Sequence, residues 1–356
     1  MNLRQHFKPA RLLAPALVTA LLLTAVVGQT QLRIRKNQKD LTTAERQLYV
    51  DALKALKNPA TGPNRGTSGL TNRYDEYVQM HGDFCIHGNG GFLPWHRKLL
   101  WEFENDVRAI APAYANFTVP YWDWTVDAFP SDLTNVGDKL FMGGDGVAVT
   151  QIVDTGPFRG GQWATLVPAT TNGATSLERK FTANIGTLIT NGAPAFTNLL
   201  TQTDYAQMAP LVEGAAGMHN NAHFFVGGQL SDTTGGADDP VFFMLHSFTD
   251  LVWARWETGT TGSLSSYTAY GASPAVNASL RGFGVPANTI GFDTTTNNLV
   301  SGQLNFLDRS TLGYTYLYDG KLLGAPEPSS VAFLGAGTLS LIGFGLRRRH
   351  RKLKAA

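Results

Sequence analysis

The chain has a single cysteine, Cys85, among its 356 residues. One cysteine cannot form an internal disulfide, so the fold must depend on its hydrophobic core, with a bound metal as a further source of stability. Charged residues are also scarce, at 16%, whereas hydrophobic residues make up 43% of the chain. This composition excludes a disordered chain and supplies ample material for a core.

Acidic residues are missing from both ends of the chain. Nine of the 29 Lys and Arg residues lie within residues 1–28 and 347–356, which contain no Asp or Glu. The remaining 20 face all 27 acidic residues in between, so the body has a formal charge of −7. The basic pI therefore belongs to the two ends, and the body offers no electrostatic footprint for nucleic acid.

The N-terminal residues 1–28 have the pattern of a secretory signal peptide. Three basic residues precede an apolar run, Leu12 to Val27, which ends at Gly28. We expect this segment to be removed and the rest of the chain to work outside the cytoplasm. A buried or membrane-retained first helix is the alternative, although the 16 apolar residues are short for a span of about 20.

The C-terminal residues 325–356 combine a proline spacer, an uncharged run and a basic end. Pro326-Glu327-Pro328 comes before the 16 uncharged residues 331–346, and six Arg and Lys residues follow. An exported chain that meets such a run should stop with its basic end inside. The triplet, run and basic cluster resemble the PEP-CTERM sorting signal of bacterial exported proteins. The resemblance implies a transient inner-membrane anchor and cleavage by an exosortase-type enzyme, and a plain C-terminal anchor is the alternative.

The body, residues 29–324, reads as helices joined by long loops. A capping box at Thr42 and Glu45 begins one helix, and apolar residues at helical spacing mark others near residues 74–81, 96–110, 219–223 and 242–253. Residues 126–203 are rich in Gly, Thr and Asn with little periodicity, so we expect mostly loops there. Short runs such as Tyr314–Tyr318 favour strands or extended segments. The fold predicted is mainly α, with a four-helix bundle and a few short strands.

Six of the eight histidines stand in apolar, aromatic helical surroundings. One histidine of this kind is most often a satisfied core residue, but six form two sets of three: His81, His87 and His96, then His219, His223 and His246. His219 and His223 are four residues apart, which places both imidazoles on one helical face. Helices that present ligands inward are how a bundle builds a dinuclear site.

The ligand type narrows the choice of metal. Imidazole suits copper, zinc, iron or nickel, whereas hard cations need carboxylates. A di-iron bundle normally carries Glu-x-x-His pairs, and the sequence has none at these positions. Two hydrolytic zinc ions would more naturally share a bridging carboxylate, and no acid falls at helical ligand spacing. Three imidazoles can hold copper in both oxidation states.

The segments around these histidines resemble the tyrosinase and polyphenol oxidase family. The likeness rests on several motifs at the family's spacing. They are His87 and His96 with the run Gly91–Arg97, His219–His223 followed by Gly227-Gly228, Asp239–Asp250, Pro120–Trp124 and Leu312–Tyr314. It spans roughly residues 33 to 320. It implies two copper ions, with His81, His87 and His96 holding the first and His219, His223 and His246 the second.

The resemblance also assigns roles to residues beside the ligands. In some members, a cysteine placed like Cys85 forms a thioether to a histidine placed like His87; a small buried side chain is the alternative for Cys85. An Asn at the position of Asn220 is proposed in the family to orient a water with a nearby Glu, which Glu213 resembles. An ordinary acid at a helix N-terminus is the alternative for Glu213. Asp250, one turn after His246, is expected to brace the helix or a ligand shell, and a solvated or Arg-paired role is the alternative.

The function that the resemblance implies is an exported copper oxidase that uses O2 to convert phenols, o-diphenols or both to o-quinones. Catechol-only oxidation, o-aminophenol oxidation and, in another class, haemocyanin-like O2 binding remain alternatives. Phe224 offers no charge for a substrate carboxylate, so bulky or uncharged phenols are expected rather than amino acids. Leu245 stands where many members have His, which removes a polar neighbour of His246. Because neutral histidines are required, activity should fall as the pH drops through about 6.5. The destination is the periplasm, cell envelope or exterior.

Overall fold

The computed structural model describes residues 32–323 except 86, 89–90, 128, 131–140, 169–172, 174, 183–184, 215–216 and 260–311. The expected signal peptide, residues 1–28, and sorting tail, residues 325–356, lie outside this part. The helices are α2 (Thr43–Lys57), α3 (Arg73–Phe84), α4 (Phe92–Ile110), α5 (Ile185–Leu200), α6 (Tyr205–Glu213), α7 (Met218–Val226) and α8 (Val241–Thr258). The strands are β1 (Arg33–Arg35), β2 (Tyr314–Tyr318) and β3 (Lys321–Leu322). The predicted mainly α class is confirmed.

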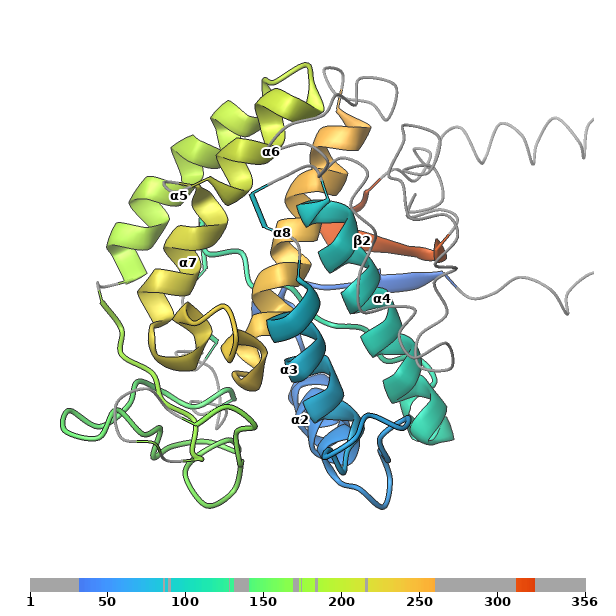
Figure 1. Ribbon diagram of the computed structural model, residues 1–356. Coiled ribbons are helices and arrows are strands. Elements are labelled where there is room, and N and C mark those ends of the chain that lie inside the picture. Colours follow the sequence, from blue (N-terminus) through green and yellow to red (C-terminus); the bar gives the residue numbers. More distant parts are fainter. Residues whose placement is uncertain are drawn as a thin grey trace, which may run out of the picture.

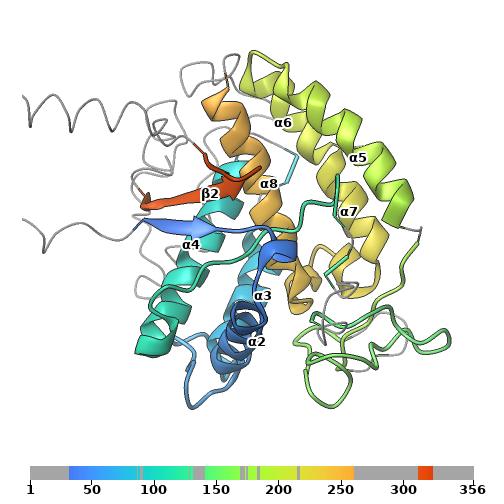
Figure 2. The same ribbon diagram turned by 180° about the vertical axis from the view of Figure 1, so that it is seen from behind.

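Helix α8 is the centre of the arrangement (Figure 1). It lies between α2, α3 and α4 on one side and α5, α6 and α7 on the other. The strand β1 pairs in parallel with β2, with Arg33 opposite Tyr314, and β3 adds to β2 in antiparallel fashion. Seen from behind, β1 and β2 cross the bundle close to α4 and α8 (Figure 2). None of the helices that the structure describes is both long and apolar enough to cross a membrane.

Local sequence signals set several of the helix starts. The capping box is present: the Thr42 side chain accepts from the Glu45 backbone N–H, and the Glu45 carboxylate accepts from the Thr42 N–H at 2.8 Å. The side chain of Asn72 caps α3 by accepting from the Asp75 N–H. Pro94 falls in the first turn of α4, where a missing backbone donor costs nothing. The start of α2 agrees with the sequence-based expectation, whereas α4 begins at Phe92, ahead of the start near His96 that the sequence indicates.

The expectation of loops over residues 126–203 is wrong for its last part. Residues 185–200 form α5, although the segment contains Gly, Thr and Asn and has Pro194 inside the helix. Intrinsic propensity is a weak guide where a helix gains its stability from packing. Helix α5 contacts α6, α7 and α8, and it buries Leu199 completely. Tertiary contacts therefore outweigh the poor local signal.

The contact between α4 and α8 is aromatic and apolar along most of its length. The Phe103 and Phe243 rings stack with centroids 3.9 Å apart, and the side chains of Leu99 and Leu245 are fully buried. Close packing of this kind keeps both helices in a fixed register. The register matters because each helix carries a histidine in its second turn, His96 on α4 and His246 on α8.

Asp250 joins these two helices to the sheet through a buried polar cluster. Its carboxylate accepts from the Arg97 guanidinium of α4, from Arg35 of β1 at 2.9 Å and from the hydroxyls of Tyr314 and Tyr316 at 2.6 and 2.7 Å. Burial by itself would raise the pKa of Asp250, but Arg97 and Arg35 hold it below its ordinary value. Asp250 is therefore Arg-paired and not solvated.

We predict that Asp250→Asn lowers the free energy of unfolding of the metal-free protein by about 3–5 kcal/mol, because two buried guanidinium groups lose a counter-charge. Urea unfolding followed by circular dichroism measures the change. Asp51→Asn, at an exposed position on α2, is the matched control and should shift stability by less than about 0.5 kcal/mol. Equal effects of the two substitutions would contradict a structural role for the cluster.

Candidate dinuclear metal centre

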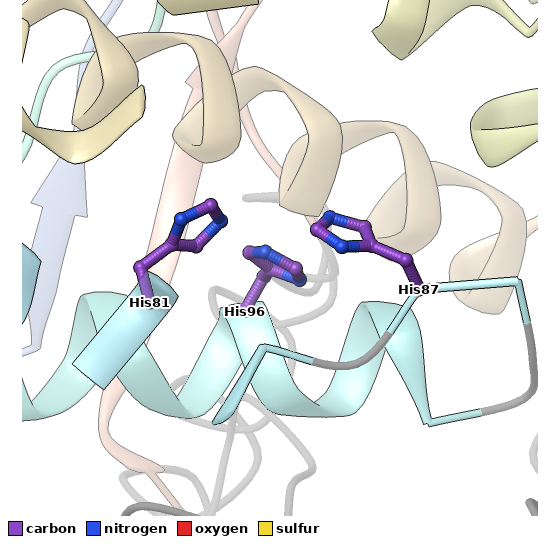
Figure 3. A group of neighbouring side chains, drawn as sticks. All are labelled: His81, His87 and His96. Carbon is purple, nitrogen blue, oxygen red and sulfur yellow. The ribbon is translucent and has the colours of Figure 1, made fainter. Parts of the chain in front are cut away.

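The first histidine trio comes from the facing ends of α3 and α4. His81 lies in the last turn of α3, His96 in the second turn of α4, and His87 in the segment between them. One ring nitrogen from each lies within 4.8 Å of the others. Figure 3 shows the three imidazoles turned toward one another. The structure brings the three histidines together, as the sequence predicts, and His87 is the exposed member.

The second trio comes from α7 and α8 and is tighter. The Nε2 atoms of His219 and His223 are 2.9 Å apart. The Nε2 atom of His246 lies 3.4 Å from that of His219 and 3.3 Å from that of His223. The spacing of four along α7 puts the first two rings on one face, and the second turn of α8 brings the third ring against them.

Hydrogen bonds to Nδ1 orient several of these rings. His96 Nδ1 is 2.8 Å from the Phe92 carbonyl, His219 Nδ1 is 2.8 Å from Asn220 Oδ1, and His223 Nδ1 is 2.5 Å from the Leu230 carbonyl. Each acceptor is an oxygen, so Nδ1 carries the proton and Nε2 keeps a lone pair.

This arrangement fits a bound cation. In the second trio, the lone pairs of His219 and His223 point at each other without a proton between them, and that repulsion is relieved by a positive ion. In the first trio, the buried His96 Nε2 has no hydrogen-bond partner among the described residues, which is costly unless a ligand meets it. A metal–imidazole bond is about 2 Å long, so nitrogens at the observed spacing can share one ion.

The two trios adjoin each other. The His96 and His246 rings stack with centroids 4.3 Å apart and an interplanar angle of 7°. Two ions held by the trios would therefore be neighbours in one centre. The contact depends directly on the α4–α8 register described above.

Burial keeps the imidazoles neutral. Desolvation lowers the pKa of His87 and of His223 from 6.5 to about 4, and it lowers the pKa of His81, His96, His219 and His246 well below 6.5. Neutral imidazole is the form that binds metal. Burial therefore moves the protonation of His87 and His223 in the copper-free protein to about pH 4. The loss of activity expected near pH 6.5 stays a prediction.

A cavity of about 300 Å³ opens onto both trios. His81 and His87 of the first trio and His219 and His223 of the second line it, together with Glu213, Asn220, Phe224 and the segment Leu230–Thr233. This volume is at the lower end for small-molecule sites. Phe224 is 53% exposed and adds an apolar side chain to the lining of the cavity.

Asn220 and Glu213 both lie at this cavity, but their side chains do not bond to each other. The Asn220 amide donates to the backbone carbonyls of Glu213 and Gly214 at 2.7 and 3.1 Å, and its Oδ1 faces His219. The Glu213 carboxylate accepts from the Gly88 N–H. Glu213 is the last residue of α6, so the alternative of an acid at a helix N-terminus is wrong.

Cys85 lies beside His87, with Sγ 3.4 Å from Nδ1. Burial raises the pKa of the Cys85 thiol to about 11, so the thiol stays protonated at neutral pH. The contact is compatible with the thioether that the resemblance implies, and the sulfur is free in this structure.

The sequence did not single out Leu230–Thr233 as part of the site. The adjacent Gly227 and Gly228 were a signal: their φ angles are +65° and +53°, and a Cβ on Gly228 would meet the Glu178 carbonyl at 2.0 Å. Only glycine tolerates this turn, which folds the segment back so that the Leu230 carbonyl reaches His223.

A mainly helical bundle that presents two adjoining histidine trios to one cavity defines a dinuclear metal protein. A family profile described as the common central domain of tyrosinase matches residues 71–259, more than half of the chain. A tyrosinase of Streptomyces antibioticus is 32% identical over 267 aligned residues, covering 68% of this chain and 89% of that protein. A grixazone synthase of Streptomyces griseus subsp. griseus is 27% identical over 274, covering 63% and 84%.

Solved structures agree in fold. A polyphenol oxidase from Thermothelomyces thermophila matches with a TM-score of 0.55 and 26% identity over 68% of this chain and 74% of that one. A functional unit of octopus hemocyanin matches with a TM-score of 0.56 and 21% identity, over 82% and 70%; this likeness concerns the fold alone. The chain belongs to the tyrosinase family and is a copper-dependent oxidoreductase. The family's two-copper centre, which works with O2, fits the two trios.

We predict that the copper-free protein loses stability as the pH falls from about 6.5 to about 4. In this window the histidines of the unfolded chain bind protons, whereas those of the folded chain stay neutral. The free energy of unfolding therefore decreases as the pH falls. Burial raises the pKa of Asp123 and Asp238 to about 6, so these two groups act in the opposite direction. They are outnumbered by the six histidines whose pKa is lowered. Urea unfolding at a series of pH values measures the slope.

The variant His223→Gln is the control for this slope. It removes one depressed imidazole, so stability should depend less steeply on pH than in the wild type. A wild-type protein whose unfolding free energy is flat over this window would contradict the assignment of six histidines that the fold keeps neutral.

Proposed function

We propose that the protein is an exported dicopper oxidase that converts phenols, o-diphenols or both to o-quinones. The observation that carries the proposal is the pair of adjoining histidine trios at the wall of one cavity. His81, His87 and His96 would hold one copper ion, and His219, His223 and His246 the other. Copper bound at these residues would supply the electron transfer from the diphenol to O2.

The chemistry balances around the diphenol. Two diphenol molecules each give up two electrons and two protons to become o-quinones, and one O2 takes up all four electrons and four protons to become two waters. The chain's own contribution is to fix the imidazoles, to hold the aromatic ring of the substrate in the cavity beside them and to receive protons at the cavity wall.

Asn220 and Glu213 divide the supporting roles in this proposal. Asn220 accepts from His219 Nδ1 and so holds that ring in the tautomer that exposes Nε2 to the metal. Its amide hydrogens are used on backbone carbonyls, which leaves Glu213 to take the phenolic proton, directly or through a water. This assignment separates two residues that the resemblance treats as a pair.

Oxidation is favoured over reversible oxygen binding as the physiological activity. The cavity admits an organic molecule beside the histidines, and the relatives named above are a tyrosinase, a grixazone synthase and a polyphenol oxidase as well as a hemocyanin. Catechol-only and o-aminophenol oxidation are special cases within the same proposal. Phe224 carries no positive charge that could pair with a substrate carboxylate, so a phenol that ends in a carboxylate gains nothing there.

Export remains part of the proposal. Residues 1–28 would direct secretion, and the PEP-CTERM-like residues 325–356 would anchor the chain in the inner membrane until an exosortase-type enzyme cuts it. The destination is the periplasm, the cell envelope or the exterior. The mass of the mature protein isolated from its host tests both cleavages.

We expect the purified chain to bind two copper ions and to oxidise 4-methylcatechol under air with uptake of O2. Metal analysis, quinone absorbance and an oxygen electrode measure these. His246→Ala should retain about one copper and lose activity by at least a thousandfold, because the second trio is broken. Two bound coppers without turnover of any diphenol would support the oxygen-binding alternative.

Glu213→Gln and Asn220→Ala should act differently if the roles are divided. We predict that Glu213→Gln lowers turnover of the monophenol tyrosol about a hundredfold relative to 4-methylcatechol, as loss of a general base does. Asn220→Ala should weaken copper binding about tenfold or more and lower both activities together. Steady-state rates at matched copper content and copper titrations separate the two. Equal loss of both activities in Glu213→Gln would overturn the proton-acceptor role.

A further inference from the structure

One acidic side chain at the cavity has no part in the proposed chemistry. Asp232 lines the cavity that opens onto both trios and is only partly buried. Glu213, also at the cavity, is buried and adds a second acidic group. Among the described residues that line the cavity, none is a lysine or an arginine. The wall therefore offers negative charge and no positive side chain to an incoming molecule.

The position of Asp232 is fixed by its neighbours. The segment is attached to a predicted copper ligand, since His223 Nδ1 lies 2.5 Å from the Leu230 carbonyl. The Asp232 backbone N–H donates to the Gln229 carbonyl at 2.9 Å, and Asp232 Oδ1 accepts from the Thr234 N–H at 2.8 Å. The bond to Thr234 uses one lone pair, so the carboxylate keeps capacity for another donor.

An aromatic face lies at the same cavity. The Phe224 ring is 53% exposed, and an aromatic ring together with a carboxylate is the combination that binds an ammonium group. A substrate whose phenol ring reaches the histidines would extend its side arm along this wall. An arm that ends in a carboxylate would meet like charge there, and one that ends in an ammonium would meet opposite charge.

We propose that Asp232 is a specificity-determining residue that makes the cavity select phenols and catechols with a cationic amine arm over those with a carboxylate arm. This rests on the proposed oxidase function and names its substrate class. Amino acids such as tyrosine carry both charges and gain less. The role in a turn does not account for the acid by itself, because an asparagine would accept from Thr234 equally well.

The test compares three catechols with the same two-carbon spacing. Dopamine ends in an ammonium, hydroxytyrosol in a hydroxyl and dihydrocaffeic acid in a carboxylate. The copper-loaded wild type should favour dopamine over dihydrocaffeic acid in kcat/KM, mainly through KM. Asp232→Asn, which keeps the bond to Thr234, should reduce this ratio by about two- to fivefold, the range of a partly exposed ion pair. Asp232→Lys should invert the preference.

Two controls separate local from global charge. Asp154→Asn changes the net charge equally at an exposed position that does not line the cavity, and it should leave the ratio unchanged. Raising the salt to 1 M, where the Debye length is about 3 Å, should shrink the wild-type preference without any substitution.

The outcomes of this experiment distinguish the role of Asp232 from the proposed oxidase function on which it rests. No oxidation of any of the three catechols by the copper-loaded wild type would overturn the proposed function. Oxidation of all three with the same ratios in wild type and Asp232→Asn, or with a preference that salt does not change, would overturn the role of Asp232 alone.

Discussion

The contact between Arg97 and Asp250 is the constraint on which the site depends. Arg97 directly follows His96 on α4, and Asp250 lies one turn beyond His246 on α8, so the ion pair fixes the two helices at the level where their imidazoles stack. A buried charge pair is a costly way to join helices. Here the cost is offset by Arg35, Tyr314 and Tyr316, which donate further hydrogen bonds to the Asp250 carboxylate. A slip of one residue between α4 and α8 would separate the two halves of the copper centre.

The histidines were identifiable from the sequence because metal ligands obey simple spacing rules. His219 and His223 could share a face only if their segment was helical, and the apolar run around His246 could hardly be anything but a buried helix. The capping box at Thr42 and the strand at Tyr314–Tyr318 were legible for the same reason: each is a local pattern with a local cause. The mainly helical class and the assembly of both trios followed from these signals.

Features that depend on contacts between distant segments could not be predicted from local sequence patterns. The helix at residues 185–200 lacks a local signal and exists because it covers α7 and α8. The orientation of the Asn220 amide is decided by carbonyls at the end of α6, and the pKa values of the histidines by how deeply the bundle buries them. Asp232 reaches the cavity only because two glycines with positive φ turn the chain back toward His223.

The pairing of β1 with β2 has a consequence for how the protein forms during synthesis. All six histidines come earlier in the chain than Tyr314 and Tyr316, whose phenol groups follow Asp250 by 64 and 66 residues. Until those tyrosines emerge, Asp250 lacks two of its donors and β1 has no strand beside it. The helices that carry the imidazoles can therefore come together before the strand pairing that fixes their register is complete. Metal acquired before that point would meet a centre that is assembled but not yet rigid.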